Sequence, residues 1–123
     1  MRYLVTARLK PGRAAPLARA VRDGTLGAGS VAGGEYLRNM RQARRLPNGD
    51  VAWVETCFCD TPLDEERPYW EAFFELRHIR DAHARSRCRH ESGETPWACT
   101  GCDCTDRLQR TLDGRGCPFL GTL

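Results

Sequence analysis

The chain has 123 residues, a formal net charge of +3 at pH 7 and 41% hydrophobic residues, which indicates one globular domain with a modest core. No apolar run approaches the roughly 18 residues that a membrane span requires, so no membrane-spanning segment is expected. The polar residues near the N-terminus interrupt any apolar stretch of the signal-peptide type, and we therefore expect a cytoplasmic protein.

The first half of the sequence predicts a strand, a helix and a second strand. Residues 2–9 are rich in β-forming side chains and are followed by a Pro-Gly turn signal. Residues 13–22 predict a short helix that stops at Gly24, since glycine favours the left-handed end of a helix. After a glycine-rich connection, residues 35–46 predict the second strand.

The middle of the sequence predicts a hairpin and then a long helix. Asn48-Gly49 suits a tight hairpin turn, after which residues 51–59 predict the third strand. From residue 61 to about 86 we predict the second helix, because the side chains of one stripe, mostly apolar, recur at spacings of three and four. These side chains are Tyr69, Ala72, Phe73, Leu76, Ile79 and His83. After an irregular segment, residues 106–113 predict a short third helix.

The segment MRYLVTA at residues 1–7, followed by this order of elements, resembles the ferredoxin-like α/β plait and the small dimeric α+β-barrel proteins. The resemblance covers residues 1–87 and implies an α+β fold, an antiparallel sheet with two helices on one face. It rests on element order and transfers no catalytic residue. Residues 88–123 depart from it, and they stand where the fourth strand of a plait is expected. We therefore predict one compact unit, in which an irregular, metal-stabilised segment at residues 88–123 packs on residues 1–87.

Seven cysteines in a chain expected in a reducing compartment indicate metal binding or thiol chemistry. Cys99 and Cys102 have the spacing at which a tight turn directs two sulfur atoms at one ion. With His90, the cysteines supply eight ligands, enough for two tetrahedral zinc sites. The predicted ligands are Cys57, Cys59, Cys88, His90, Cys99, Cys102, Cys104 and Cys117.

Cys57 and Cys59 are expected on one face of the third strand, because residues two apart in a strand point to the same side. Trp53 and Glu55 share that face, whereas the alternate face, with Val54 among its residues, is the more apolar. We therefore predict that Cys57 and Cys59 lie on the open face of the sheet, near its edge. The C-terminal tail would then fold over that face and bring further thiolates to the pair.

The first functional interpretation is a zinc protein with a structural or interaction role. An iron–sulfur protein is the alternative, since Cys117-Pro118 after a Cys-x2-Cys pair is similar to cluster-binding sequences. A thiol-dependent enzyme on the ferredoxin-like scaffold is a third interpretation, and buried thiols with an incidental disulfide are a fourth. Catalytic residues are not identified. The partner is expected to be an unidentified protein or a second copy bound through the sheet. No nucleic-acid partner is predicted, because aromatic residues are not interleaved with the arginines.

Overall fold

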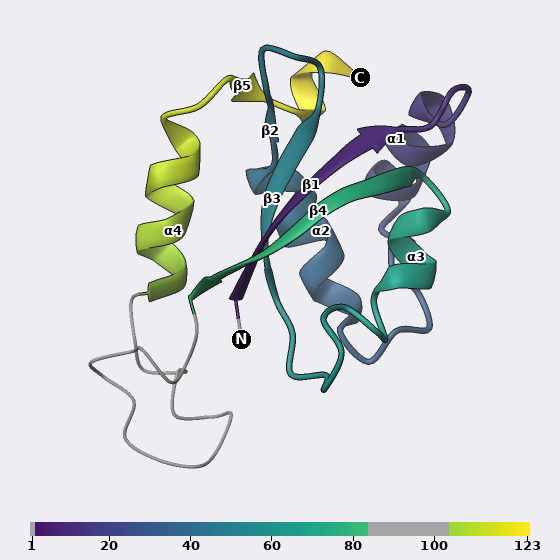
Figure 1. Cartoon of the computed structure of the whole chain (residues 1–123). Coiled ribbons are helices and arrows are strands. Elements are labelled where there is room, and N and C mark those ends of the chain that lie inside the picture. The colour runs from purple at the N-terminus through teal and green to yellow at the C-terminus, as the bar shows by residue number, and fades with distance from the viewer. Residues whose placement is uncertain (1, 84–103) are drawn as a thin grey trace.

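A computed structural model describes residues 2–83 and 104–123 of the chain. In these ranges the fold is mixed α+β, with a five-stranded antiparallel sheet and four α-helices (Figure 1). The strands are β1 (Arg2–Leu9), β2 (Arg44–Arg45), β3 (Val51–Thr56), β4 (Phe74–His83) and β5 (Cys117–Pro118). The helices are α1 (Ala14–Asp23), α2 (Gly33–Gln42), α3 (Arg67–Glu71) and α4 (Cys104–Asp113), with a 3-10 helix at Leu120–Thr122. None of these helices has the length and apolar character needed to cross a bilayer.

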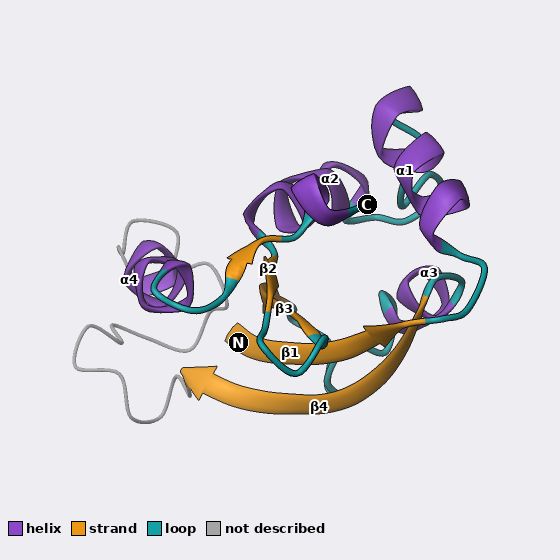
Figure 2. Cartoon of the chain, turned by 90° about the horizontal axis from the view of Figure 1, so that it is seen from above, coloured by secondary structure: helices purple, strands orange, loops and turns teal. Residues whose placement is uncertain are grey.

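The sheet has the strand order β4-β1-β3-β2-β5, and helices cover both of its faces. Figure 2 shows α1, α2 and α3 on the concave side of the curved sheet and α4 on the other side. Because successive strand residues point to opposite faces, Val51 and Trp53 enter the main core, whereas Ala52 and Val54 pack against Leu112 of α4. The predicted α+β class with an antiparallel sheet is therefore confirmed, but the helices are not confined to one face.

The prediction of one long helix over residues 61–86 is wrong. This part of the chain contains the short helix α3 and then β4, which pairs with β1 along its whole length. Phe74 and Leu76 alternate with charged residues, so the sequence also fits the period of two of a strand. Pairing with the interior strand β1 selects the extended form. The fourth strand therefore precedes the Cys-rich segment and does not lie within it.

The predicted strand over residues 35–46 is also wrong, except at Arg44–Arg45, where β2 forms. The preceding residues form α2, whose buried side chains Tyr36, Asn39 and Met40 are spaced as on one helical face. Two glycines open this helix, and glycine is a poor helix former, so local propensity conceals it. Packing of Tyr36 and Met40 in the main core stabilises the helix instead.

The other local predictions are confirmed, except that the third strand, predicted over residues 51–59, ends at Thr56. β1 and α1 form as expected, and Gly24 ends α1 in the left-handed conformation, with a φ of 71°. Gly49 has a φ of 90° in the turn between β2 and β3, which pair in an antiparallel hairpin. The short helix predicted at residues 106–113 forms as α4, two residues longer at its start.

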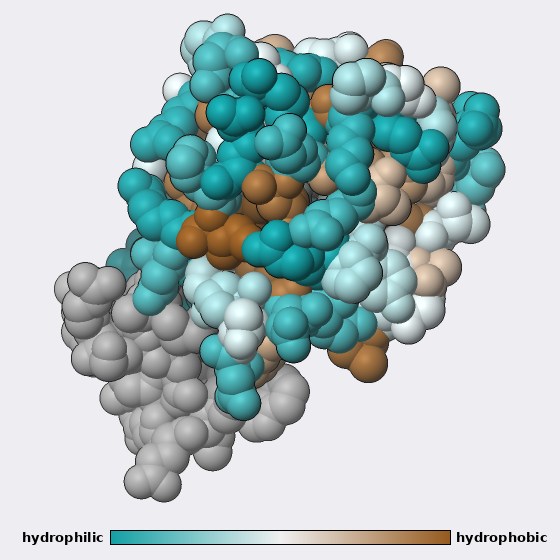
Figure 3. Space-filling model, turned by 45° about the vertical axis from the view of Figure 1, so that its right-hand side comes forward, coloured by the Kyte–Doolittle hydropathy of each residue, from teal (hydrophilic) through white to brown (hydrophobic). Residues whose placement is uncertain are grey.

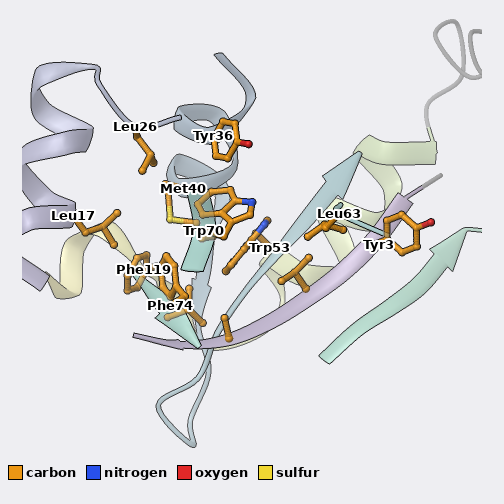
Figure 4. Close-up of a cluster of buried hydrophobic side chains, with 14 of the residues drawn as sticks. Tyr3, Leu17, Leu26, Tyr36, Met40, Trp53, Leu63, Trp70, Phe74 and Phe119 are labelled. Atoms are coloured by element: carbon orange, nitrogen blue, oxygen red, sulfur yellow. The ribbon is translucent and has the colours of Figure 1, made fainter. Parts of the chain in front are cut away.

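Aromatic side chains fill the main core between the sheet and α1, α2 and α3 (Figure 4). Trp70 lies at the centre, with its ring centroid 4.6 Å from that of Trp53 and 4.9 Å from that of Tyr36. Phe74 and Phe119 extend the cluster toward the last described residues. The outer surface is mainly hydrophilic on the side shown in Figure 3, where apolar side chains gather in a small patch. Because the aromatic rings of the main core are buried against one another, they contribute strongly to the stability of the fold.

Gly27 lies directly against the ring of Tyr36. Its φ is +74°, and a Cβ atom at this position would lie 2.1 Å from a ring carbon. Gly12 has a similar φ of +76° but has open space around it. We expect Gly12→Ala to lower the free energy of unfolding by about 1–2 kcal/mol, the cost of a left-handed alanine. Gly27→Ala should cost about 1–3 kcal/mol more, because the methyl group also overpacks the core. Urea unfolding of both variants tests this prediction. Equal losses of unfolding free energy in the two variants would contradict the close contact between Gly27 and Tyr36.

Candidate metal centre

The end of β3 and the start of α3 bring two cysteines and a glutamate together. Cys57 directly follows β3, Cys59 comes two residues later, and Glu66 immediately precedes α3. One possible ligand atom from each side chain lies within 4.8 Å of the other two. In the described parts of the chain, no other three His, Cys, Asp or Glu side chains meet in this way.

One carboxylate oxygen of Glu66 faces both thiols. The Cys57 thiol donates to Glu66 Oε2 at 3.3 Å, and the Cys59 sulfur lies 3.9 Å from the same oxygen. The backbone N–H of Cys59 donates to the Cys57 sulfur at 3.3 Å. Cys57 and Glu66 are buried, and Cys59 is partly buried. A buried carboxylate is costly unless strong donors or cations surround it, and thiols are weak donors. A cation bound at this site would therefore stabilise the buried carboxylate of Glu66.

The loop between β3 and α3 positions Glu66. Leu63 has a φ of 60°, a left-handed conformation that no other non-glycine residue adopts in the described ranges. Its side chain is fully buried in the main core (Figure 4), and its carbonyl accepts the N–H of Arg67 at 2.8 Å. Burial of the leucine offsets the roughly 1 kcal/mol or more that the backbone conformation costs. The turn at Leu63 brings the chain back so that Glu66 meets Cys57.

The neighbouring Glu65 has a different role from that of Glu66. Its two carboxylate oxygens accept the Ser30 hydroxyl at 2.9 and 2.8 Å, and one also accepts the N–H of Val31 at 3.2 Å. Tyr36 donates in turn to the Ser30 oxygen at 3.0 Å. Glu65 therefore ties the loop before α2 to the segment that carries Glu66.

All three candidate ligands line one open cleft of about 790 Å³. The loop before α2 forms one side of this cleft, with Val31 and Ala32, and the segment after β3 forms another, with Phe58. The beginning of β1 and the first turn of α4 also contribute to the walls. Because the donors are largely buried and yet border the cleft, they form part of its floor.

Burial raises the pKa of the Cys57 thiol to about 12, so without a metal this side chain is protonated at neutral pH. The nearby backbone amides of Cys59 and Leu63 lower the pKa, but burial is the larger effect. A reactive cysteine requires the thiolate form, so Cys57 alone does not have the environment of a nucleophile. A bound metal ion would displace the thiol proton, as it does in thiolate metal sites.

A second buried carboxyl lies deeper in the core and does not line the cleft. Glu55 accepts hydrogen bonds of 2.9 Å from the amide of Asn39 and from the indole N–H groups of Trp53 and Trp70. Burial raises the pKa of Glu55 to about 7, and the charge of Glu66 adds to this rise, while the three hydrogen bonds oppose it. Glu55 thus connects the aromatic cluster with β3 and α2.

The prediction that Cys57 and Cys59 occupy an open sheet face is wrong for Cys57. Cys57 belongs to the main core, on the same side as Trp53 and Glu55, and Phe58 is exposed. The error has a physical reason, because α4 covers the alternate face, so both faces of β3 are buried and apolar alternation does not distinguish them. Glu66 was not predicted as a ligand, because acidic residues before a helix usually stabilise its dipole.

The remaining predicted ligands are placed as follows. Cys117 is exposed in β5 and pairs with Arg45, which in turn pairs with Val51 at the start of β3. The end of β3 at Thr56, next to Cys57, is about 17 Å further along the strand. Cys117 is therefore not part of the cluster. Cys104 begins α4, and its side chain is outside the described residues, as are four whole residues. These four are Cys88, His90, Cys99 and Cys102, so the full set of eight ligands stays a prediction.

No protein-family model matches the chain, and neither does any curated protein or any solved structure. The kind of ligand that this site can bind is therefore inferred from its donor atoms alone. These are two thiols and a carboxylate at the floor of a cleft.

Proposed function

We propose that this chain is a small zinc-binding protein in which Cys57, Cys59 and Glu66 hold the metal. The observation that supports the proposal is the spacing of the donors. Zinc binds thiolate sulfur at about 2.3 Å and carboxylate oxygen at about 2.0–2.2 Å, so donors of a tetrahedral shell lie roughly 3.3–3.8 Å apart. The two sulfurs lie 3.3 and 3.9 Å from Glu66 Oε2, so one separation is at the lower end of this range and the other is about 0.1 Å above its upper end.

The donor types favour zinc over an iron–sulfur cluster. Clusters are held mainly by four cysteine thiolates, sometimes with histidine, whereas zinc accepts mixtures of sulfur and oxygen ligands. A carboxylate facing two thiols fits zinc better on this ground. The thiol-enzyme interpretation is less favoured, because burial keeps Cys57 protonated in the absence of a metal. The scaffold that we propose for the site is a ferredoxin-like sheet, whose strand order β4-β1-β3-β2 is extended by β5.

Metal analysis of protein purified without added metal tests the proposal. We expect zinc in the wild-type protein and about one equivalent less in the double variant C57S/C59S, because two of its thiolate ligands are gone. The variant E66Q should bind zinc at least about ten-fold more weakly in a competition assay with a chromogenic chelator. The matched control is D64N, which removes an exposed carboxylate outside the cluster and should leave the zinc content and the zinc affinity unchanged.

Two results would contradict the proposal. One is wild-type zinc content in the double variant together with a normal far-UV circular dichroism spectrum. The other is brown protein after anaerobic purification, with visible absorption that C57S/C59S abolishes, because this result assigns an iron–sulfur cluster to the same residues.

A further inference from the structure

Cys57 and Cys59 lie close enough to form a disulfide with each other. Their sulfur atoms are at most 4.8 Å apart, and both side chains are free thiols in the structure. The backbone N–H of Cys59 donates to the Cys57 sulfur at 3.3 Å, which keeps the Cys57 side chain turned toward its neighbour.

The chain between the two cysteines also has a suitable length for a disulfide. Two steps of extended chain cover at most about 7 Å, near the upper end of the 4.4–6.8 Å that usually separates the Cα atoms of a disulfide. Both cysteines follow the end of β3 at Thr56 and lie outside its pairing with β1. Side-chain rotation and a slight bend after Thr56 would therefore join the sulfurs without breaking the sheet.

The two thiols differ in their exposure. Cys57 is 1% exposed, whereas Cys59 is only partly buried and lines the cleft. Oxidation of a cysteine depends on its exposure, so an oxidant meets the sulfur of Cys59 first. The buried sulfur of Cys57 then lies beside the oxidised atom, in the position of a resolving cysteine.

From this geometry we infer that Cys57 and Cys59 are a site of oxidative modification, at which a peroxide converts the two thiolates to a disulfide and thereby releases the zinc ion. The inference rests on the proposed zinc site and adds a form of regulation to it. Zinc binds cysteine as the thiolate, so the disulfide removes two ligands at once. Of the three described donors, only the carboxylate of Glu66 would remain.

The electrons for this step pass from sulfur to the peroxide, because zinc has no redox chemistry of its own. The Cys59 thiolate attacks one peroxide oxygen, and the O–O bond breaks to give a sulfenic acid and a hydroxide ion. The Cys57 thiolate, whose proton the metal has displaced, then attacks the Cys59 sulfur. The S–S bond forms, the S–O bond breaks, and a second hydroxide ion leaves. The two hydroxide ions take up two protons from the solvent and become water.

Treatment of the zinc-loaded protein with hydrogen peroxide tests the inference. Residues 46–77 form one tryptic peptide that contains Cys57 and Cys59 and no other cysteine. After peroxide treatment and alkylation, this peptide should carry no alkyl group and should be lighter than the reduced peptide by two hydrogen atoms. A chromogenic chelator should detect about one equivalent more released zinc from the wild-type protein than from C57S/C59S. Dithiothreitol should restore the two thiols, and added zinc should then bind again.

Two single variants test the order of attack. In C57S the neighbouring thiol is gone, so dimedone, a reagent for sulfenic acids, should label Cys59 after peroxide treatment. In C59S the buried Cys57 should be labelled several-fold less, because the oxidant has little access to it.

Two results would overturn this inference while leaving the zinc site intact. One is a disulfide that joins Cys57 or Cys59 to a different tryptic peptide. The other is a peptide 46–77 that remains fully alkylated after peroxide treatment. Equal zinc content of the wild-type protein and C57S/C59S before peroxide is added would instead overturn the zinc site and, with it, this inference.

Discussion

Replacement of Trp70 with alanine is expected to lower the free energy of unfolding by about 3–5 kcal/mol, the range for truncation of a buried aromatic side chain. Trp70 is fully buried at the centre of the aromatic cluster, and its indole N–H also donates to Glu55. Small domains are stable by about 5–15 kcal/mol in total, so the variant should unfold at a much lower urea concentration. Urea unfolding followed by circular dichroism measures the difference.

The matched variant Trp70→Phe separates the two contributions of this side chain. Phenylalanine keeps an aromatic ring in the cluster but removes one donor from the buried carboxyl of Glu55, which should cost about 1–3 kcal/mol. If W70A and W70F lose the same amount of stability, the packing of the indole contributes little. If W70A loses less than about 1 kcal/mol, the central place of Trp70 in the core is wrong.

The stability of the metal-free protein is expected to fall as the pH rises from about 4.5 to about 7, because of Glu55. Its pKa in the folded state is raised to about 7 from an ordinary value of 4.5, mainly by burial. Below pH 4.5 the carboxyl is protonated in both states, and its contribution is fully present. Between the two pKa values the unfolded chain loses the proton while the folded protein retains it, so that contribution is lost. A difference of this size corresponds to roughly 3 kcal/mol.

The variant Glu55→Gln should remove this part of the pH dependence, since glutamine does not titrate. Asn39 can accommodate the change, because its Oδ1 atom has no hydrogen-bond partner in the wild-type protein. A rotation of the Asn39 side-chain amide by about 180° would place Oδ1 where the amide nitrogen now donates to Glu55, and Oδ1 would then accept from the amide of the new glutamine. Urea midpoints at several pH values from 4 to 8, measured for both proteins, give the comparison. Parallel curves for the two proteins would show that Glu55 does not titrate in this range.

The elements that were predicted correctly have strong local signals. The turn at Asn48-Gly49, the glycine that ends α1 and the β-forming residues of β1 each act over a few residues. In contrast, α2 and β4 depend on distant parts of the chain. The residues of β4 fit both a helical and an extended period, and only the pairing with β1 decides between them.

The candidate site was predictable only in part. Cys57 and Cys59 were predicted as metal ligands from the sequence, because two cysteines separated by one residue can bind the same ion. Their burial depends on helix packing on both faces of β3, which alternation within one strand does not report. Glu66 joins them through the turn at Leu63, and a positive φ at leucine has no sequence signal.

The position of β1 between β3 and β4 affects how the chain folds during synthesis. This strand is translated first, but its neighbours β3 and β4 begin only at Val51 and Phe74. At about 5–20 residues per second, roughly 3–13 seconds pass before the ribosome reaches β4. The edge of β1 that pairs with β4 lacks its partner for this whole interval, and the other edge lacks its partner until β3 has been made. The nascent chain would therefore benefit from chaperones that shield unpaired strand edges.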